Sequence, residues 1–298
     1  MAYHIPALLT ESIDGLNIRP EGTYVDVTFG GGGHSAEILK RITTGRLIAF
    51  DQDEDAASNI INDSRFLFLD QNFRFLRNNL LFNGINEIDG LIADLGVSFH
   101  QFDEPGRGFT FRQDAPLDMR MNRNSKTTAA DLLNTLPEEE IAGILYNYGE
   151  LTNSRKIAKE IAAARNRNRL KSVNDIMNAV GRLVPVKQEH KFYAKLFQAL
   201  RIAVNREMEN LKEMLQQAGE MLKPGGRLAI ITYHSLEDRI VKNFMRTGNF
   251  EGEEKKDFYG NVESPFRLIA KKGITPSEDE IIANNRSRSA RLRIAEKI

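Results

Sequence analysis

Short apolar runs alternate with helix-like stretches over the first hundred residues, and this alternation constrains the fold more than any other feature of the chain. The runs are 24–28, 46–50, 66–69 and 91–93. Strands and helices alternating at this length predict a parallel sheet with right-handed crossover connections, and therefore an α/β fold. The first run stops at four glycines, Gly30–Gly33, and the second and fourth stop at Asp51 and Asp94. Open parallel sheets bind ligands at the carboxyl ends of their strands, so we expect the functional site there.

The alternation stops near residue 102, where the chain changes character. A loop rich in proline and glycine runs to about residue 124, and several helical segments follow it. One of them begins after Ser172, which has Asp175 three residues later and so resembles a capping box. We therefore divide the chain into a first domain, made of 1–103 and 191–298, and a mostly helical insertion, 104–190.

The last hundred residues are expected to return to the first domain. Apolar residues step by three or four from Leu196 to Leu222, which predicts one continuous helix that Pro224-Gly225-Gly226 ends. A strand at 227–232 and a helix at 236–245 follow, with two further strand candidates at 266–270 and 290–295. The two late strands suit an antiparallel edge of the sheet.

Composition narrows the class of protein. The chain has 298 residues, with 41 basic and 41 acidic side chains, 41% hydrophobic residues and no Cys. The hydrophobic share predicts a folded core, and the lack of Cys excludes disulfides, thiolate metal sites and cysteine nucleophiles. No apolar run approaches a membrane span and the N-terminus lacks a signal-peptide layout, so we expect a cytoplasmic protein without membrane contact. The five His show no metal-ligand spacing, so no metal is expected.

Two basic clusters stand out against the neutral total charge. Residues 155–171 hold seven Lys and Arg against Glu160, and residues 286–297 hold five against Glu296. Such clusters can neutralise the phosphates of RNA or DNA, although a solvated helix face is the plainer interpretation of either cluster alone. The RNA-binding candidates among them are Arg165, Arg167, Arg169, Arg286, Arg288 and Arg291.

The glycines after the first strand predict a close approach of the backbone to a ligand. Asp51 lies 51 − 32 = 19 residues beyond Gly32, the spacing at which an acid accepts both hydroxyls of an adenosine ribose. This pattern fits a nicotinamide-dependent dehydrogenase and also a methyltransferase that uses S-adenosylmethionine (SAM). Asp26, inside the first strand, suits the ammonium group of SAM, but it suits equally a role in bonding the loop amides. No Gly-Lys-Ser/Thr follows the glycines, which excludes a P-loop.

Asp94 closes the fourth strand and is our candidate for chemistry on an amine. The exocyclic amine of a nucleobase is a weak nucleophile because its lone pair is delocalised into the ring. A carboxylate that accepts its N–H groups would localise that pair and hold the nitrogen in line with a methyl donor. Methylation at cytosine C5 ordinarily needs a cysteine thiolate, so the lack of Cys closes that route.

Seven motifs spread over nearly the whole chain are more specific than the glycine loop alone. They are HIPALLTE (4–11), DVTFGGGGHS (26–35), DLGVS (94–98), RGFTF (107–111), PLDMRM (116–121), HSLEDR (234–239) and RSRSARLR (286–293). Together, and in this order, they resemble the bacterial 16S ribosomal RNA cytosine-N4 methyltransferase family of the MraW type. Three places depart from the pattern of that family: Gly31, Phe99-His100 where Ser-Pro is common, and Asn284-Asn285 where Asn-Pro is usual.

This resemblance implies SAM-dependent methylation of N4 of a cytidine in the decoding region of 16S ribosomal RNA, within the small ribosomal subunit. It implies a Rossmann-like SAM-binding domain, with the helical insertion as the domain that meets the RNA. By motif match, seven residues would form the SAM pocket: Gly32, Gly33 and His34 at the methionine end, Asp51 at the ribose, Phe73 on the adenine, and Asp94 with Gln101 completing it.

The family lacks the Asp/Asn-Pro-Pro-aromatic signature of many amine methyltransferases, and Asp94 stands at the equivalent strand end. Asp94 is therefore the candidate for polarising the target amine. Asp118 and Tyr233 are further candidates for binding a base flipped out of its stack, and for each a purely structural role is the alternative. We expect His234, just past the fifth strand, to be structural.

Two other functions remain as alternatives. A nicotinamide-dependent oxidoreductase would explain the glycines and Asp51 but not the arginine-rich tail or the late strands. A non-catalytic RNA-binding assembly factor would explain the basic clusters but not the combination of glycine loop, Asp51 and Asp94. The sequence does not fix the oligomeric state, for which a homodimer is one option.

Overall fold

A computed structural model describes residues 6–260 and 263–298 of the chain. The chain divides into two compact units, one made of Met1–Gly96 with Met208–Ile298 and the other of Val97–Glu207. The predicted boundaries, 103/104 and 190/191, fall inside the second unit. They differ because the segment 191–205, assigned to the first domain from its sequence, is part of a helix whose apolar face is buried in the second unit.

The first unit is built on a seven-stranded sheet with the order β3-β2-β1-β4-β5-β7-β6. Its strands are β1 (Thr23–Asp26), β2 (Arg46–Asp51), β3 (Phe66–Asp70), β4 (Ile88–Asp94), β5 (Leu222–Thr232), β6 (Phe266–Leu268) and β7 (Arg291–Lys297). The first five strands pair in parallel, and β7 runs antiparallel to both β5 and β6. The predicted parallel sheet and its antiparallel late strands are thus confirmed.

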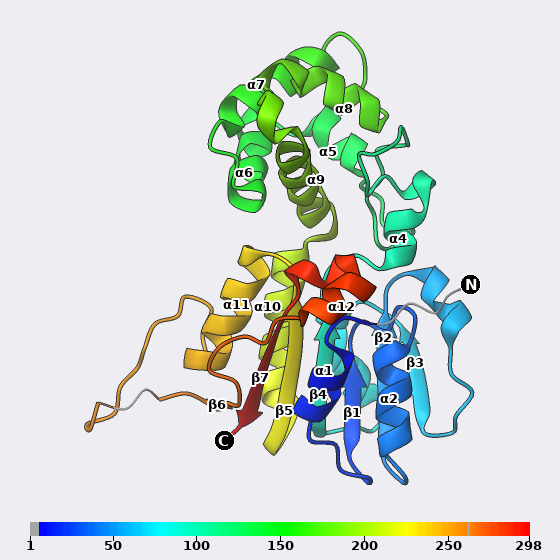
Figure 1. Ribbon diagram of the computed structural model, residues 1–298, viewed down its shortest axis with the longest axis vertical. Helices are drawn as coiled ribbons and strands as arrows, with labels where there is room; N and C mark the ends of the chain where they lie inside the picture. The colour runs from blue at the N-terminus through cyan, green and yellow to red at the C-terminus, as the bar shows by residue number, and fades with distance from the viewer. Residues whose placement is uncertain (1–5, 261–262) are drawn as a thin grey trace. The chain divides into compact units, whose positions relative to one another are not determined.

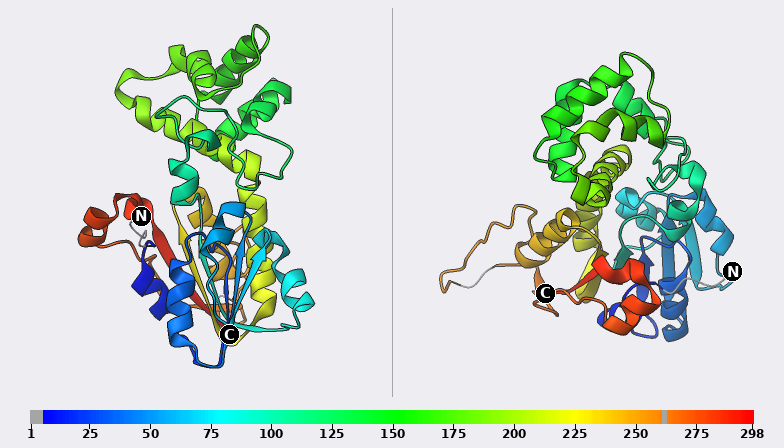
Figure 2. Two further views of the ribbon diagram at one scale, coloured as in Figure 1. Left: turned by 90° about the vertical axis from the view of Figure 1, so that its right-hand side faces the viewer. Right: turned by 45° about the horizontal axis from the view of Figure 1, so that its top comes forward.

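Helices cover both faces of this sheet (Figures 1 and 2). On one face α1 (Leu9–Gly15) and α2 (Gly33–Arg41) bury Ile13 and Ile38 against Tyr24 and Ile92. The other face is covered by α3 (Leu76–Phe82), α10 (Glu207–Met221) and α11 (Ser235–Thr247). Because the central strands are buried on both sides, they appear in the sequence as continuous apolar runs rather than as an alternating pattern.

The second unit is mostly helical and has its own core. Its helices are α4 (Phe99–Asp103), α5 (Ala129–Thr135), α6 (Glu138–Gly149), α7 (Ser154–Arg165), α8 (Val173–Val180) and α9 (Glu189–Asn205). Ser172 and Asp175 form the predicted capping box at α8. Within the described residues, no helix combines the length and the apolar character that a membrane crossing requires.

The predicted continuous helix from 196 to 222 is wrong. Arg206 adopts a left-handed conformation with φ 52°, and this separates α9 from α10. Asn205 explains the break, because its side-chain amide donates to the carbonyl of Met119 (2.8 Å) and accepts from the amide of Met121 (2.7 Å). The apolar spacing continues across the break, so the periodicity could not reveal it. Leu222 pairs with Ile88 as the first residue of β5.

Candidate cofactor and catalytic site

Four aspartates close the first four parallel strands. Asp26, Asp51, Asp70 and Asp94 are the last residues of β1, β2, β3 and β4. Asp51 and Asp70 face each other in the register of β2 and β3. The carboxyl edge of the sheet therefore carries an acidic row, at the place where an open α/β sheet binds its ligand.

The glycine loop joins β1 to α2. Gly30 (φ 49°) and Gly32 (φ 76°) have left-handed conformations that glycine adopts without strain. At Gly33 a side chain is excluded because a Cβ atom would lie 2.3 Å from the ring of Pro6. At Gly31 no atom lies within 4 Å of the Cβ position, so the departure from the family pattern there is sterically neutral. The loop thus brings bare backbone to the edge of the sheet.

Asp51 connects this loop to the end of β2. One carboxylate oxygen accepts a hydrogen bond from the amide of Gly30 (2.8 Å), and the other accepts from the amide of Asp53 (2.9 Å). Burial raises the pKa of Asp51 to about 6, although the two amide bonds oppose the rise. Each oxygen keeps a second lone pair for a ligand hydroxyl. The structure therefore brings together the glycine loop and the spaced acid.

Asp26 bonds the loop itself. It is 1% exposed, and its two oxygens accept from the amide of Thr28 (3.1 Å) and from the hydroxyl of Ser35 (2.8 Å) in α2. Burial raises its pKa to about 6. Of the two interpretations of Asp26, this geometry supports a carboxylate that holds the loop.

His34 lies in the first turn of α2 and is 5% exposed. Burial lowers its pKa to about 4, so the ring is neutral near pH 7, and it hydrogen-bonds the backbone of Ala7. Its Nε2 has no hydrogen-bond partner among the described residues. A buried ring nitrogen of this kind, beside a loop that excludes side chains, fits a ligand that carries its own hydrogen-bond donor.

Asp94 and Tyr233 form the pair most suited to chemistry. The Tyr233 hydroxyl donates to Oδ1 of Asp94 (2.8 Å), and the Asp94 amide donates to Oγ1 of Thr28 (2.6 Å). Burial raises the pKa of Asp94 to about 7; the Tyr233 hydrogen bond opposes the rise, and the charges of Asp26 and Glu237 add to it. Oδ2 of Asp94 accepts no hydrogen bond from the described residues. The carboxyl thus has one fixed oxygen and one available oxygen.

Two residues that support this pair were missed by sequence reasoning. Thr28 joins the end of β1 to the end of β4, and Glu237 accepts from the amide of Tyr233 (2.9 Å) while being 2% exposed. His234, three residues before Glu237, caps α11 through its ring. This is the structural role that we expected for His234. Thr28 lies in the glycine motif, but nothing local in the sequence indicates a partner 66 residues away.

Phe73 begins η2 (Phe73–Phe75) three residues after the end of β3, and its partly buried ring packs against the core of the first unit. Asn72, just before it, caps η2 and donates to Oε1 of Gln52 (2.6 Å), which follows Asp51. This bond joins the segments after β2 and β3. Phe73 and Asp51 therefore share the carboxyl edge, whereas contact of Phe73 with adenine stays a prediction.

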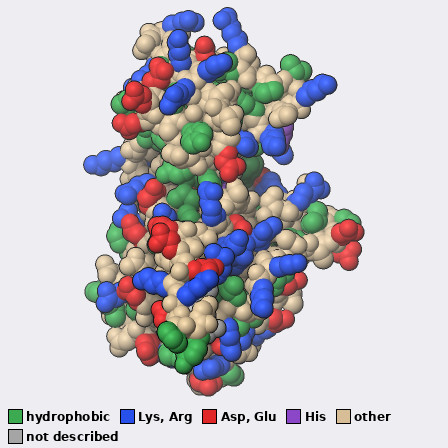
Figure 3. All heavy atoms as spheres, turned by 90° about the vertical axis from the view of Figure 1, so that its left-hand side faces the viewer, with side chains coloured by type: hydrophobic (Ala, Val, Ile, Leu, Met, Phe, Trp, Pro, Cys, Tyr) green, Lys and Arg blue, Asp and Glu red, His purple; other side chains and the backbone are tan. Residues whose placement is uncertain are grey.

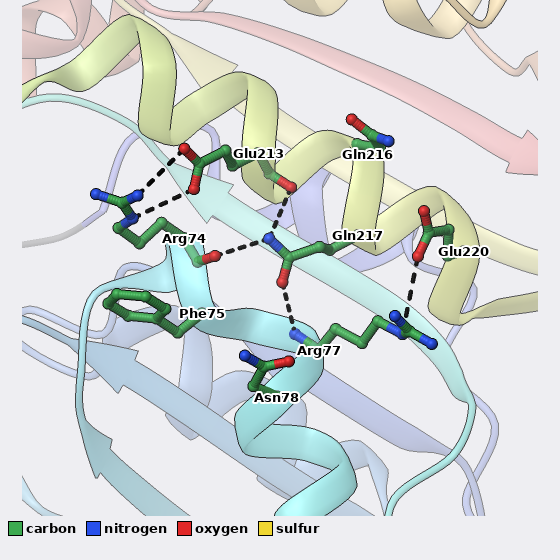
Figure 4. A pocket seen from close by; sticks show the side chains of 8 residues that line it. All are labelled: Arg74, Phe75, Arg77, Asn78, Glu213, Gln216, Gln217 and Glu220. Atoms are coloured by element: carbon green, nitrogen blue, oxygen red, sulfur yellow. Dashed lines mark hydrogen bonds and ion pairs between the residues drawn. The ribbon is translucent and has the colours of Figure 1, made fainter.

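A cavity of about 390 Å³ lies between α3, with the η2 segment before it, and α10 (Figure 4). Its polar groups pair with one another: Arg74 with Glu213 (3.2 Å) and Arg77 with Glu220 (3.8 Å). The Gln217 side chain donates to the carbonyl of Arg74 (2.7 Å) and accepts from the amide of Arg77 (2.9 Å). Gln217 thus satisfies two backbone groups at the start of α3, where no side chain of the same segment caps the helix. The polar residues that line the cavity therefore hold α3 against α10.

Gln101 and Asp118 belong to the second unit. Oε1 of Gln101 accepts from the amide of Ser98 (3.1 Å), and Ser98 Oγ accepts from the amide of Gln101 (3.2 Å), which makes a capping box for α4. Two side-chain bonds from Arg120 (2.7 and 2.8 Å) hold Asp118. Burial alone would raise the pKa of Asp118, but the bonds from Arg120 outweigh it and lower the pKa. These contacts support a structural role for Asp118.

The basic candidates of the second unit have different surroundings. Arg165 is half-buried and donates to the carbonyls of Leu133 and Leu136 (both 2.7 Å), so it caps the end of α5 rather than facing solvent. Arg169 pairs with Asp131 (2.9 Å). Arg167 is exposed and has no partner among the described residues. Of these three candidates, Arg167 is the one whose side chain is fully available to a phosphate.

The basic tail lies at the carboxyl edge of the sheet. Arg286 and Arg288 are exposed in η6 (Asn285–Ser289), and Arg291 is the exposed first residue of β7. In the register of β5 and β7, Arg291 lies opposite Thr232, next to Tyr233. Arg291 is therefore close in the sheet to Tyr233 of the Asp94–Tyr233 pair. Asn284 accepts from the amide of Arg286 (3.2 Å) and starts η6 without the proline usual in the family.

A sheet of this order with β7 reversed, a glycine loop after β1 and an acid at the end of β2 together define a SAM-dependent methyltransferase. SAM is the methyl donor of this class. A sequence model of the MraW methylase family matches residues 1–298, and the chain therefore belongs to the MraW methylase family. The family and the cofactor expected from the sequence are confirmed.

Relatives of this chain carry a more specific name. A protein of Bacteroides fragilis named "Ribosomal RNA small subunit methyltransferase H" is 58% identical over 99% of this chain and 97% of its own length. A protein of Flavobacterium johnsoniae with the same name is 51% identical over 100% of this chain and 99% of its own length. Among solved structures, an rRNA methylase from Streptococcus thermophilus aligns with a TM-score of 0.44 and 13% identity over 99% of each chain.

Proposed function

We propose that this protein transfers the methyl group of SAM to N4 of a cytidine in the decoding region of 16S ribosomal RNA. The observation that carries the proposal is the carboxyl of Asp94, fixed on one oxygen by Tyr233 and available on the other, at the end of β4. The names of the relatives support ribosomal RNA of the small subunit as the substrate. A cytoplasmic location follows, since ribosomal subunits are found there.

The first unit would hold the cofactor along the carboxyl edge. Gly32 and Gly33 would bind its methionine end through their backbone, with Nε2 of His34 accepting from the ammonium group. Asp51 would accept from the ribose hydroxyls, and Phe73 would pack on the adenine. Bound SAM supplies an electrophilic methyl group on a sulfonium sulfur. The motif match adds Gln101 as a further proposed SAM ligand.

Asp94 would act on the nucleophile. Its available Oδ2 would accept an N–H of the cytosine amine, which localises the nitrogen lone pair and aims it at the methyl carbon. The methylated nitrogen must then lose a proton, and a carboxylate whose pKa is about 7 is well matched to take it. Tyr233 is proposed to help hold the flipped base. With no Cys in the chain, a thiolate adduct on the ring is not available.

The second unit and the basic tail of the first unit are both proposed to bind the RNA substrate. Arg167, Arg286, Arg288 and Arg291 are exposed and suited to phosphates. Arg169, paired with Asp131, would exchange that partner for a phosphate, whereas Arg165 is committed to the end of α5. The family membership favours methyl transfer over the nicotinamide-dependent alternative.

The test is mass mapping of ribosomal RNA after small subunits lacking the modification are incubated with the protein and labelled SAM. We expect one methyl group on one cytidine amine in the decoding region. Asp94→Ala should lower turnover by at least about a hundredfold, whereas Glu87→Gln, an exposed residue just before β4 and at the opposite end of that strand, should leave turnover unchanged. Both variants should unfold as the wild type does. A wild-type protein that methylates no RNA, or an Asp94→Ala variant with normal turnover, would refute the proposal.

A further inference from the structure

The motif HSLEDR (234–239) contains one residue that the fold does not use. His234 caps α11, and Glu237 holds the amide of Tyr233. Asp238 binds Arg293 of β7 through two bonds of 2.7 and 2.9 Å. Arg239, the last residue of the motif, is exposed and forms no hydrogen bond or ion pair with the described residues. The Arg239 side chain therefore contributes no hydrogen bond or ion pair to the described part of the fold and is accessible to a ligand.

Arg239 lies on a face of α11 whose exposed charged side chains are all cations. Leu236, Val241, Phe244 and Met245 bury the opposite side of this helix. The exposed positions of α11 follow one another at spacings of four, three and four residues, and they are Ser235, Arg239, Lys242 and Arg246. We call Arg239, Lys242 and Arg246 the α11 basic face.

Few acids neutralise the α11 basic face. Lys242 has no partner among the described residues, and Arg246 lies 3.7 Å from Glu254 at the far end of the helix. Ordinary protein surfaces mix both signs of charge, and this chain has equal numbers of acids and bases. A helix face with three cations and no acid is therefore a local concentration of positive charge. Figure 3 shows Lys and Arg side chains gathered on this side of the molecule.

The α11 basic face continues the arginines of the tail. Nη1 of Arg291 lies 3.7 Å from Oδ2 of Asp238, the residue before Arg239. Arg291 itself lies opposite Thr232, the last residue of β5, and α11 begins three residues later, at Ser235. The positive surface therefore starts beside the Asp94–Tyr233 pair and extends along α11.

We propose that the α11 basic face binds the phosphate backbone of the RNA that flanks the target nucleotide. The inference rests on the proposed function and adds to it a surface for the RNA strand outside the catalytic pocket. Lys and exposed Arg on a helix face neutralise phosphates without reading sequence, so they position the strand rather than select the base. Binding here keeps the flanking chain in place while the target base is turned toward Asp94.

The experiment measures RNA binding and methyl transfer separately. The double variant Arg239→Gln with Lys242→Gln is compared with the wild type for affinity to small-subunit RNA, between about 50 and 300 mM salt. We expect a loss of affinity of about tenfold and a salt slope smaller by about 1.5, since each lost phosphate contact contributes about 0.7–0.9. The KM for RNA should rise by a similar factor, while kcat and the affinity for SAM change less than about twofold.

Two controls isolate the face. Arg46→Gln removes an exposed arginine from the first residue of β2, at the opposite edge of the sheet, and should leave RNA affinity unchanged. Arg239→Lys with Lys242→Arg exchanges the side chains but keeps the charges, and it should restore most of the affinity. An unchanged affinity and salt slope in the double Gln variant, or an equal loss in Arg46→Gln, would overturn the inference. A wild-type protein that binds RNA through this face but methylates none would instead overturn the proposed function.

Discussion

The hydrogen bond from Tyr233 lowers the pKa of Asp94. The tyrosine hydroxyl donates to the carboxylate and so stabilises the charged form, which opposes the larger effect of burial. The pKa of Tyr233 is itself raised, first by burial and then by the charge of Asp94, so the tyrosine stays a donor at any pH of interest. The pair is therefore a carboxyl that titrates near neutrality beside a hydroxyl that does not.

Replacing Tyr233 by Phe should move the acid limb of the pH profile. Without the donor the pKa of Asp94 rises above about 7. If the ionised carboxylate is the active form, activity is lost as pH falls through that pKa, so the limb shifts to higher pH. We expect kcat to fall about three- to tenfold near pH 6.5 and by less than about twofold near pH 9. The measurement is kcat for methyl transfer across this range.

Tyr24→Phe is the matched control for this profile. Tyr24 is also buried in the first unit, and its hydroxyl accepts from the amide of Arg19 (2.7 Å). Its loss should lower the stability and leave the shape of the pH profile unchanged. An equal loss of activity at every pH in Tyr233→Phe would show that the tyrosine does not set the pKa of Asp94.

The positions of the cofactor candidates were predictable where they follow strands. Asp51 and Asp94 end apolar runs, and parallel strands bring their carboxyl ends to one edge. Arg165 was not predictable, because its role depends on two backbone carbonyls 29 and 32 residues away. The same holds for Thr28, whose hydroxyl serves a strand that is distant in sequence. Sequence patterns report the element that carries a residue but not its partner across the fold.

At the scale of elements, α3 depends on a residue from another helix. Gln217 of α10 satisfies the carbonyl of Arg74 and the amide of Arg77 at the start of α3. Removing it leaves both backbone groups without these bonds. Gln217→Ala should therefore lower the free energy of unfolding by about 1–2 kcal/mol, as loss of a helix cap does.

Gln216→Ala is the control, since Gln216 is the exposed neighbour on the same helix. Urea unfolding at constant SAM concentration measures both variants. Gln216→Ala should stay within about 0.5 kcal/mol of the wild type. Equal effects of the two substitutions would mean that helix propensity, rather than the bridge to α3, explains the loss.

The elements with strong local signals were predictable, and those set by distant contacts were not. The apolar runs gave β1 to β5 because buried parallel strands have few alternatives in sequence. The break at Arg206 was missed because Asn205 is held by Met119 and Met121, far away in the chain. The observed unit boundary differs from the predicted boundary for the same reason. α9 belongs to the second unit because its apolar residues pack in the core of that unit.

At the scale of the whole molecule, each unit has its own core. The first unit buries its sheet between two sets of helices, and the second buries a separate helical cluster. Calorimetry should therefore resolve two unfolding transitions. SAM at about 100 times its Kd should stabilise the first unit by about 2.7 kcal/mol, because most of its proposed contacts lie there.

The second transition should move less than the first when SAM is added. Asp51→Ala should abolish the shift of the first transition by removing the ribose acceptor. NAD at the same concentration is the control ligand, and it should move neither transition. A single cooperative transition, or a shift of both transitions by the same amount, would contradict this assignment.

The order of β5 and β7 in the sheet has a consequence for synthesis of the chain. One edge of β4 pairs with β5, whose first residue lies 222 − 94 = 128 positions after the end of β4. β7, which lies between β5 and β6 in the sheet, is formed by the final residues of the chain. At about 5–20 residues per second, the open edge of β4 is exposed for roughly 6–25 s on the translating ribosome. A nascent chain in this state has an unpaired strand edge that promotes aggregation, so its dependence on chaperones should be greatest before β5 emerges.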